Sequence, residues 1–351
     1  MFLTAAVTDP PFTTLMFAFG CPMLVALALT AMLIRLAPRL GLVDQPGARK
    51  VHTTPTPRAG GVAIYAAILL AGWLFRREAG EGTFQLILWG GLIALIGLVD
   101  DMKPLPWYLR LGVQMLIVGF VIYSGGGNHT WCFKLVGFFW VVGLINAFNM
   151  LDNMDALSAG VAWIVAGMLA MADFLHRPYP QWAETITLLM LMGAISGFLW
   201  FNRPPAKIFM GDAGSTFLGF YLGIRSLNAP AVSLDHVATW VMPLCILSVA
   251  LYDMTSVIIL RLWQGRSPFH GDKQHLSHRL NDLGLTKPAA VRVIYLLAIA
   301  SGISGVVSAA AADFWSGIIL LQVIATWLAV AALEFVRHFR AKTDPGPEAL
   351  P

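Results

Sequence analysis

Charged side chains are scarce in this sequence. Of its 351 residues, 58% are hydrophobic and only 12% are Asp, Glu, Lys or Arg, whereas a soluble domain carries about 25% of these charged residues. The mean hydropathy is correspondingly high, at +0.72. This balance excludes an ordinary soluble domain and gives no basis for nucleic-acid binding. It predicts an integral membrane protein in contact with the lipid bilayer.

Cysteine is also rare, with three residues in the whole chain. Cys21, Cys132 and Cys245 lie in or beside apolar segments and give no disulfide framework, so they are interpreted as packing residues. The first residues, MFLTAAVTDPPF, lack the basic stretch that opens a secretory signal peptide. The first apolar run is therefore expected to be a membrane anchor that is not cleaved.

Long apolar runs make up most of the remaining chain. About eleven of them (10–11) are candidate transmembrane helices, because about 20 apolar residues span a bilayer. Their approximate ranges are 13–36, 59–75, 83–99, 108–123, 132–148, 158–174, 184–201, 213–228, 237–260, 291–311 and 315–337. The predicted fold is an all-α polytopic bundle, with residues 1–340 in a single domain and residues 341–351 as a disordered tail.

The basic residues divide unequally between the two ends of these helices. If eleven helices alternate in direction, 18 of the 23 Lys and Arg residues fall on one side. Because Lys and Arg are enriched in cytoplasmic loops, that side is predicted to be cytoplasmic, with the N-terminus outside and the C-terminus inside. The clusters of polar residues described next all fall on this side, which indicates one functional face.

Asp100 and Asp101 follow the apolar run GLIALIGLV at the expected end of a helix. A carboxylate is tolerated far better at the membrane interface than at its centre, so a solvated helix end would explain both residues. Two adjacent carboxylates are also a common way to hold Mg²⁺ on a phosphate-bearing substrate. Both interpretations stay open, and a DDxxD motif is excluded because Pro104 occupies its last position.

Four polar residues follow one another at three-residue intervals in NAFNMLDNMDAL: Asn146, Asn149, Asp152 and Asp155. This spacing drifts about 60° per step around an α-helix, so the four cannot share one narrow face. Either the helix ends near Asp152 or it tightens toward a 3₁₀ helix. In both cases a polar patch is expected where the chain leaves the membrane.

Asp212 lies between glycines in KIFMGDAGSTFLGF, at the expected start of a helix. Small residues let a ligand approach the backbone, and a helix N-terminus favours phosphate. The alternative is that Asp212 only caps its own helix. The GxxxxGK[ST] spacing of a P-loop is absent.

Two further segments are rich in basic residues and histidine. HGDKQHLSHRL places His275 and His278 beside Arg279, which fits a phosphate-binding cluster better than a zinc site, although an amphipathic cytoplasmic helix is the alternative. ARKVHTTPTPRAGG contains Lys50, His52 and Arg58 in a Pro-punctuated loop. Attraction to lipid headgroups would explain the charges of this loop equally well.

These clusters occur together in an order that resembles a known family. GLVDQPGARKVHTTPTPRAGG, LVDDMKPLPWYLRLGVQ, NAFNMLDNMDAL, KIFMGDAGSTFLGF and DKQHLSHRL span about residues 41–284. They are similar to the motifs of the polyprenyl-phosphate N-acetylhexosamine-1-phosphate transferases, and more so to the branch that uses GlcNAc than to phospho-MurNAc-pentapeptide translocase. The resemblance implies Mg²⁺-dependent transfer of a sugar 1-phosphate, most closely GlcNAc-1-phosphate, from a UDP-N-acetylhexosamine to undecaprenyl phosphate, releasing UMP and initiating a cell-surface glycan.

The resemblance also implies roles for individual residues of this chain. Asp212 and Asn149 would ligate Mg²⁺, with Mn²⁺ as the alternative ion, and Asp100 and Asp101 would serve the lipid phosphate or a metal-linked network. The phosphates or the sugar would be surrounded by Lys50, His52, Arg58, Arg110, His275, His278 and Arg279. Asp152, Asp155 and Phe209 complete the expected substrate site, Asp155 and Phe209 facing the uracil. The catalytic candidates are Asp100, Asp101, Asn149, Asp212 and His275. The implied location is the cytoplasmic face of the bacterial inner membrane, and the family also implies a homodimer, which no residue of this chain requires.

Two motifs depart from the family pattern. The usual DGxDG is here Asp152-Asn153-Met154-Asp155-Ala156, and the usual HxHH is His275-Leu276-Ser277-His278. One alternative is therefore that the protein is a relative of this family that binds lipid phosphate without catalysis. A secondary transporter is the other, because such proteins carry ionisable groups inside the membrane. Asp253, within ILSVALYDMTSVIIL, is the acid that supports the transporter.

Overall fold

The computed structural model describes residues 10–45, 55–124, 130–175, 182–228, 237–267 and 274–343, and nearly all of its regular structure is helical. The helices are α1 (Phe12–Leu36), α2 (Gly60–Leu74), α3 (Arg76–Ala79), α4 (Glu81–Met102), α5 (Trp107–Ser124), α6 (Trp131–Leu151), α7 (Leu157–Leu175), α8 (Trp182–Asn202), α9 (Gly211–Leu227), α10 (Val241–Ile246), α11 (Ser248–Trp263), α12 (Leu276–Asp282), α13 (Lys287–Ala309) and α14 (Asp313–Thr343). Two 3₁₀ turns, Ala37–Leu40 and Val237–Trp240, precede β1 and α10, respectively. Every apolar range predicted from the sequence overlaps at least one of these helices.

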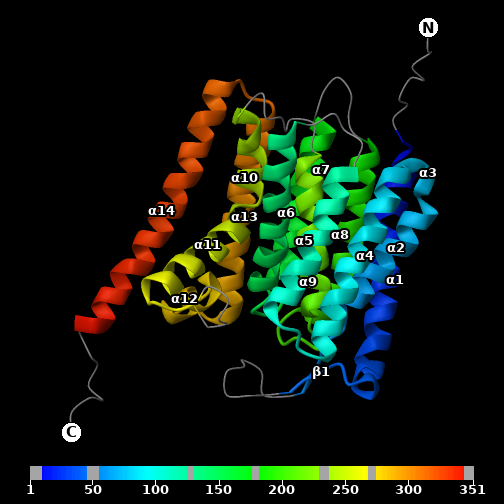
Figure 1. The fold of residues 1–351 in the computed structure, drawn as a ribbon, viewed down its shortest axis with the longest axis horizontal. Helices are drawn as coiled ribbons and strands as arrows, with labels where there is room; N and C mark the ends of the chain where they lie inside the picture. The colour runs from blue at the N-terminus through cyan, green and yellow to red at the C-terminus, as the bar shows by residue number, and fades with distance from the viewer. Residues whose placement is uncertain are drawn as a thin grey trace.

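Eight helices in the described parts of the chain are long and apolar enough to cross a membrane: α1, α4, α5, α6, α7, α8, α13 and α14. They confirm an all-α multi-pass membrane protein. The apolar helices α2 and α9 are shorter, with 15 and 17 residues. The total of about eleven spans and the orientation of the termini remain predictions, although α1 begins and α14 ends at opposite ends of the bundle (Figure 1). Of the expected tail, residues 344–351 lie outside the described part, and α14 continues to Thr343.

One predicted helix is wrong in detail. Residues 237–260 were expected to form a single helix, but they form a 3₁₀ turn followed by α10 and α11. Pro243 has no N–H, and its ring crowds the carbonyl of the residue four positions earlier, which accounts for the tighter winding at Val237–Trp240. α11 then leaves the direction of α10 and leans toward α14 (Figure 1).

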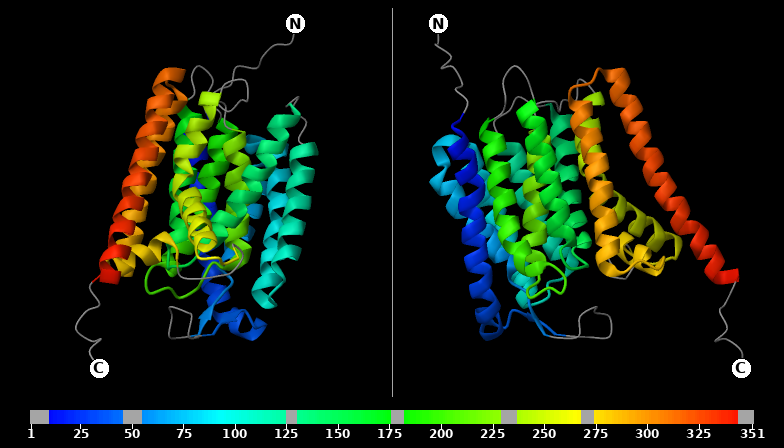
Figure 2. Two further views of the ribbon diagram at one scale, coloured as in Figure 1. Left: turned by 60° about the vertical axis from the view of Figure 1, so that its left-hand side comes forward. Right: turned by 180° about the vertical axis from the view of Figure 1, so that it is seen from behind.

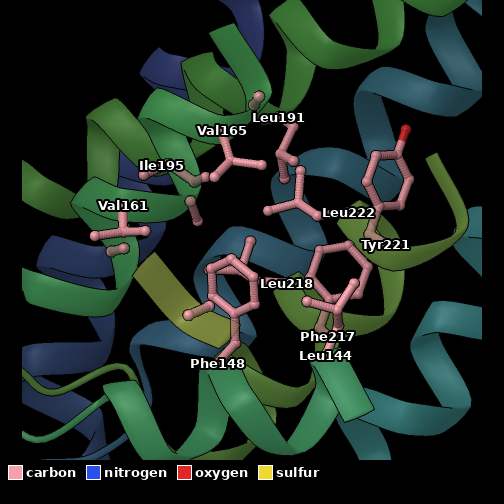
Figure 3. Close-up of a cluster of buried hydrophobic side chains, with 14 of the residues drawn as sticks. Leu144, Phe148, Val161, Val165, Leu191, Ile195, Phe217, Leu218, Tyr221 and Leu222 are labelled. Atoms are coloured by element: carbon pink, nitrogen blue, oxygen red, sulfur yellow. The ribbon is translucent and has the colours of Figure 1, made fainter. Parts of the chain in front are cut away.

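The core lies where α6, α7, α8 and α9 meet. α9 is buried along nearly its whole length and packs against α2, α4, α6 and α7. Figure 3 shows the apolar side chains that fill this centre. Those labelled are Leu144, Phe148, Val161, Val165, Leu191, Ile195, Phe217, Leu218, Tyr221 and Leu222. A buried α9 fixes the position of its own N-terminus, which carries Asp212.

The lower end of the bundle in Figure 1 gathers segments that are far apart in the sequence. β1 (Val43–Asp44) and β2 (Thr56–Pro57) form a short antiparallel pair there, with Val43 opposite Pro57. The N–H of Phe209 donates to the carbonyl of Pro57 (2.8 Å), so the chain entering α9 runs beside β2. α11 and α12 lie between α14 and the remaining helices at the same end, where α14 diverges from the bundle (Figure 2).

Candidate active site

Three carboxylates meet where α4 ends and α9 begins. Asp100 and Asp101 are in the last turn of α4, and Asp212 is in the first turn of α9. The two helices approach closely because of glycine: a Cβ on Gly97 would lie 2.5 Å from the carbonyl of Asp212. Gly211, with φ of +75°, brings its Cα so near to Asp101 that a Cβ would lie 2.5 Å from Oδ2. The glycines around Asp212 therefore admit neighbouring helices, and this corrects the interpretation that they make room for a ligand.

Asp101 holds the start of α9. Its Oδ1 accepts from the N–H of Asp212 (2.9 Å) and its Oδ2 accepts from the N–H of Ala213 (3.1 Å). These N–H groups have no partner within an α-helix, so a carboxylate from another helix satisfies them. The side chain of Asp101 is 0% exposed. The alternative that Asp212 caps its own helix is wrong, because its carboxylate binds arginines instead.

Two arginines link the three carboxylates, and these five residues are called the carboxylate cluster below. Arg58, which follows β2, contacts Asp101 through Nε and Asp212 through Nη2, both at 2.9 Å. Nη1 of Arg110, in α5, lies 2.6 Å from Asp100 Oδ2 and 3.0 Å from Asp212 Oδ2. Asp100 and Asp212 therefore face the same guanidinium nitrogen. Three negative and two positive charges leave the cluster with a formal excess of one negative charge.

The residues of the cluster fit a hard divalent cation. Mg²⁺ prefers oxygen ligands and is usually held by one or two carboxylates together with substrate phosphates. Asp100 and Asp212 provide two such carboxylates side by side, whereas both oxygens of Asp101 are occupied by backbone N–H groups. Within the described ranges, no group of three or more His, Cys, Asp or Glu side chains forms a complete metal cage. A cation here would therefore take its remaining ligands from water or from substrate phosphates.

The polar segment after α6 lies beside the carboxylate cluster. Nδ2 of Asn149 donates to Ser215 Oγ in α9 (3.1 Å), one helical turn after Gly211. α6 ends at Leu151 with Asp152 as its C-cap, which confirms the prediction of a helix end and excludes a 3₁₀ continuation. Burial raises the pKa of Asp152 to about 8; the charge of Arg58 opposes this shift, and the charges of Asp212, Asp101 and Asp155 add to it.

The turn at 152–156 is fixed by three neighbouring elements. Oδ2 of Asp155 accepts from the N–H of Ala206 (3.0 Å), and Asn202 accepts from the N–H of Ala156 (2.9 Å). The hydroxyl of Tyr295, in α13, donates to the carbonyl of Ala156 (2.5 Å). Ala156 has φ of +63°, a backbone conformation that glycine adopts more readily. Ala156 thus keeps a glycine-like turn without being glycine.

A second group of charges lies around α12, and Asp253, His275, Arg279 and Glu334 are called the histidine cluster below. Nδ1 of His275 lies 2.8 Å from Asp253 Oδ2, and the ring of His278 lies 6.4 Å from the ring of His275. Arg279 Nε lies 3.1 Å from Glu334 Oε1 in α14. Oγ of Ser277 donates to Asn153 Oδ1 (2.5 Å), which ties α12 to the turn at 152–156.

Comparison with known proteins shows the family to which this chain belongs. Residues 83–229, which contain the three carboxylates, match glycosyl transferase family 4. The chain is 32% identical to the probable undecaprenyl-phosphate N-acetylglucosaminyl 1-phosphate transferase of Bacillus subtilis, covering 90% of both chains. It belongs to the polyprenyl-phosphate N-acetylhexosamine-1-phosphate transferases. The chain is therefore a phosphoglycosyl transferase.

Two further relatives place the chain in the same family. It is 32% identical to the decaprenyl-phosphate N-acetylglucosaminephosphotransferase of Mycolicibacterium smegmatis over 74% of both chains. It is 30% identical to the undecaprenyl-phosphate alpha-N-acetylglucosaminyl 1-phosphate transferase of Escherichia coli K12, over 75% of this chain and 76% of the relative. The motif resemblance stated from the sequence is thereby confirmed for this transferase.

The structure brings most of the predicted site residues to two neighbouring places. Asp100, Asp101, Asp212, Arg58 and Arg110 form the carboxylate cluster, with Asn149, Asp152, Asp155 and Phe209 around it, whereas His275, His278 and Arg279 belong to α12. The predicted residues Lys50 and His52 lie outside the described residues. Asp253, the acid that supported a transporter, pairs with His275 at 2.8 Å.

Sequence reasoning missed three polar residues that hold the site together. Asn202 accepts from Ala156 N–H and donates to Ile208 O (2.8 Å), so it joins the turn at 152–156 to the loop before α9. Tyr295 and Ser277 contact the same turn from α13 and α12. The sequence offered two signals, the asparagine that ends the apolar run GFLWFN and Ser277 as a departure from HxHH, whereas Tyr295 is an ordinary helix residue in the sequence.

Proposed function

We propose that this transferase moves GlcNAc 1-phosphate from UDP-GlcNAc to undecaprenyl phosphate, releases UMP, and so initiates a cell-surface glycan in the bacterial inner membrane. The observation that carries this proposal is the carboxylate cluster, in which acids from α4 and α9 meet two arginines at one end of the bundle. Acids that can hold a cation and guanidinium groups that can bind phosphate are what a diphosphate donor and a lipid phosphate require. The named activities of the relatives support the same reaction.

The metal proposed for this site is Mg²⁺, with Mn²⁺ as a substitute. Asp100 and Asp212 would hold it, and Asn149 is close enough to α9 to take part. When bound, the ion would neutralise the charge that accumulates on the transferred phosphoryl group. Asp101 acts differently, because it fixes the start of α9 and thereby the position of Asp212.

Arg58 and Arg110 are proposed to exchange partners when substrates bind. Each guanidinium now balances two carboxylates, and each side chain retains about one-third of its exposure, at 35% and 31%. A planar guanidinium can bind a phosphate through two parallel hydrogen bonds. A cation on the carboxylates would free both arginines for the phosphates of the donor and of the lipid.

The proposed chemistry is a single direct transfer. The second pKa of a phosphate monoester is about 6, so the lipid phosphate is mostly a dianion at neutral pH and needs little help from a base. Catalysis then rests on positioning and on neutralising charge, which are the tasks that the carboxylate cluster can perform. No aspartate needs to become covalently attached to the sugar phosphate.

Isotope exchange tests this mechanism. Enzyme freed of lipid is incubated with UDP-GlcNAc, Mg²⁺ and labelled UMP. Direct transfer predicts no labelled UDP-GlcNAc until undecaprenyl phosphate is added. Exchange without the lipid, and its loss in Asp100→Asn or Asp101→Asn, would establish a covalent aspartyl intermediate and overturn the single-step proposal.

The donor sugar and the side of the membrane need separate tests. Purified protein should form lipid-linked product from radiolabelled UDP-GlcNAc, and turnover of another UDP-hexosamine alone would overturn the donor while leaving the reaction class. A non-catalytic relative or a transporter would form no lipid-linked product. Cysteines introduced near Lys103 and Arg203 should resist an impermeant thiol reagent in intact cells, and labelling from outside would overturn the cytoplasmic face.

A further inference from the structure

Asp253 is a carboxylate inside an apolar helix, and the proposed chemistry gives it no role. It lies in the middle of α11 and is 0% exposed. A carboxylate is removed from water only at a high free-energy cost unless it is paired and hydrogen-bonded. The partners of Asp253 therefore indicate what the residue does.

Both carboxylate oxygens of Asp253 are directed to α12. Oδ2 lies 2.8 Å from Nδ1 of His275, and Oδ1 accepts from the N–H of Leu276, the first residue of α12, at 2.6 Å. The helix is therefore capped by a side chain from α11. Asp101 caps the start of α9 in the same way, from α4.

A second contact one helical turn further along α11 fixes the angle of α12. Nη2 of Arg279 donates to Ser256 Oγ at 2.8 Å. Asp253 and Ser256 are three residues apart on α11, and His275 and Arg279 are four residues apart around α12, so each pair faces the other helix. Two contacts prevent α12 from pivoting about the first one.

The pairing also selects the chemical form of the His275 ring. A carboxylate accepts hydrogen bonds and donates none, so Nδ1 of His275 carries the hydrogen. Nε2 is then the nitrogen that remains to accept a proton or, in the charged ring, to donate to a phosphate.

We propose that Asp253 is a positioning residue that sets both the location and the tautomer of His275 for binding the phosphates of the donor. This inference rests on the proposed function and on the contact with a phosphate or the sugar that the family resemblance implies for His275. It assigns Asp253 to the transferase reaction in place of an ion pathway. Asp253 acts through His275 and does not itself touch the substrate.

The first test is Asp253→Asn in the full-length purified protein. The single amide oxygen can still accept from Leu276 N–H, but the amide nitrogen then faces Nδ1 of His275 and favours the wrong tautomer. We expect kcat to fall about 100-fold, the lower range for loss of one hydrogen-bond donor directed at the charge of the transition state. The KM for UDP-GlcNAc should change less, because such an interaction is stronger in the transition state than in the bound donor. Asp173→Asn is the matched control, because Asp173 is also a buried acid in a transmembrane helix and should retain the kcat of the folded protein.

The second test asks whether Asp253 acts through His275. In a His275→Gln background, Asp253→Asn should produce no additional loss of kcat. Losses that multiply in the double variant, or a kcat for Asp253→Asn equal to that of the wild type, would overturn the proposal.

A third readout does not depend on activity. In protein labelled with ¹⁵N-histidine, the ring signal missing from His275→Gln should report hydrogen on Nδ1 in the wild type and on Nε2 in Asp253→Asn. An unchanged ring signal in Asp253→Asn contradicts the positioning role whatever sugar the enzyme transfers. Absence of transfer in the wild type, with the expected change in the ring signal, would instead contradict the proposed function alone.

Discussion

The carboxylate cluster and the histidine cluster both pair acids with cations, but they differ in their access to solvent. In the carboxylate cluster the side chains of Arg58 and Arg110 are about one-third exposed. In the histidine cluster Asp253 is 0% exposed and His275 is 7% exposed, and Arg279 and Glu334 are also largely buried. The arginines of the first cluster can exchange partners with a ligand, whereas Asp253 and Arg279 of the second are paired with His275 and Glu334 inside the protein.

This difference in exposure indicates that the two clusters have different roles. Charges that remain accessible can bind a metal ion and phosphates, because water and ligands can replace the present partners. Charges that are buried and paired instead fix the geometry of α12 against α11 and α14. Changes in the first cluster should therefore affect the binding of metal and phosphates directly, and changes in the second should act through the position of α12 and the tautomer of His275.

The largest expected effect belongs to Asp212. Asp212→Asn removes one of the two carboxylate charges that contact Arg110; the other belongs to Asp100. We expect the rate of transfer to fall by about 10³-fold, the upper range for loss of one electrostatic group in an active site. The measurement is the rate of lipid-linked product formation by protein that elutes as a single folded species. Asp313→Asn, at an exposed position in α14, is the control and should retain the wild-type rate. A rate for Asp212→Asn within a few-fold of the wild type would contradict the site.

Within the carboxylate cluster, substitution of Asp101 should reduce stability more than substitution of Asp100. An amide at position 101 can accept only one of the two N–H groups at the start of α9, and its own N–H₂ faces the other. Asp101→Asn should therefore lower the free energy of unfolding by about 1–3 kcal/mol, the usual penalty for an unsatisfied buried group. Asp100→Asn should lower it less, because Asp100 accepts from one backbone N–H, that of Leu105 (2.5 Å), and a single amide oxygen can keep that bond. Thermal unfolding of the two variants in the same detergent compares them, and the opposite order would contradict the capping role.

A smaller effect, on stability, is expected where the two residues that depart from the family motifs contact each other. Asn153 and Ser277 replace residues of the DGxDG and HxHH patterns, and their side chains are 2.5 Å apart. Asn153→Gly and Ser277→Ala should be non-additive in stability by about 1 kcal/mol, as contacting residues usually are. Asn146→Ala with Ser277→Ala serves as the control pair, since Asn146 bonds to Gln114 and Val142 instead. Additivity in the first pair would mean that the contact contributes nothing.

Much of the fold and the identity of the acids could be predicted from the sequence. Apolar runs define the helices because the bilayer requires long spans, and the acids fall at helix ends because charge is tolerated there. Asp100, Asp101 and Asp212 were therefore predicted to lie at one end of the bundle. The hydrogen-bond partners could not be predicted, because Asn202, Tyr295 and Ser277 contact the turn at 152–156 from elements far away in the sequence.

Two sequence-based interpretations failed for local reasons. The glycines around Asp212 were expected to admit a ligand, but Gly211 admits Asp101, and Gly214 lies so close to Gly61 that a Cβ would be 2.7 Å from its Cα. Small residues permit close approach, but the pattern does not say what approaches. Residues 237–260 were expected to form a single helix, and the apolar run carries no information about the break at Leu247 between α10 and α11.

The Mg²⁺ dependence of transfer tests the division between the two clusters most directly. The rate is measured against Mg²⁺ concentration for the wild type, Asp100→Asn and Asp253→Asn. Asp100→Asn removes a proposed metal ligand, so its half-saturating Mg²⁺ concentration should rise. Loss of an outer-shell partner lowers metal affinity by roughly 10- to 100-fold, and loss of a ligand should cost at least as much. Asp253→Asn should lower the maximal rate and leave the half-saturating concentration unchanged. A normal Mg²⁺ requirement in Asp100→Asn, with a shifted one in Asp253→Asn, would contradict the assignment of the carboxylate cluster as the metal and phosphate site.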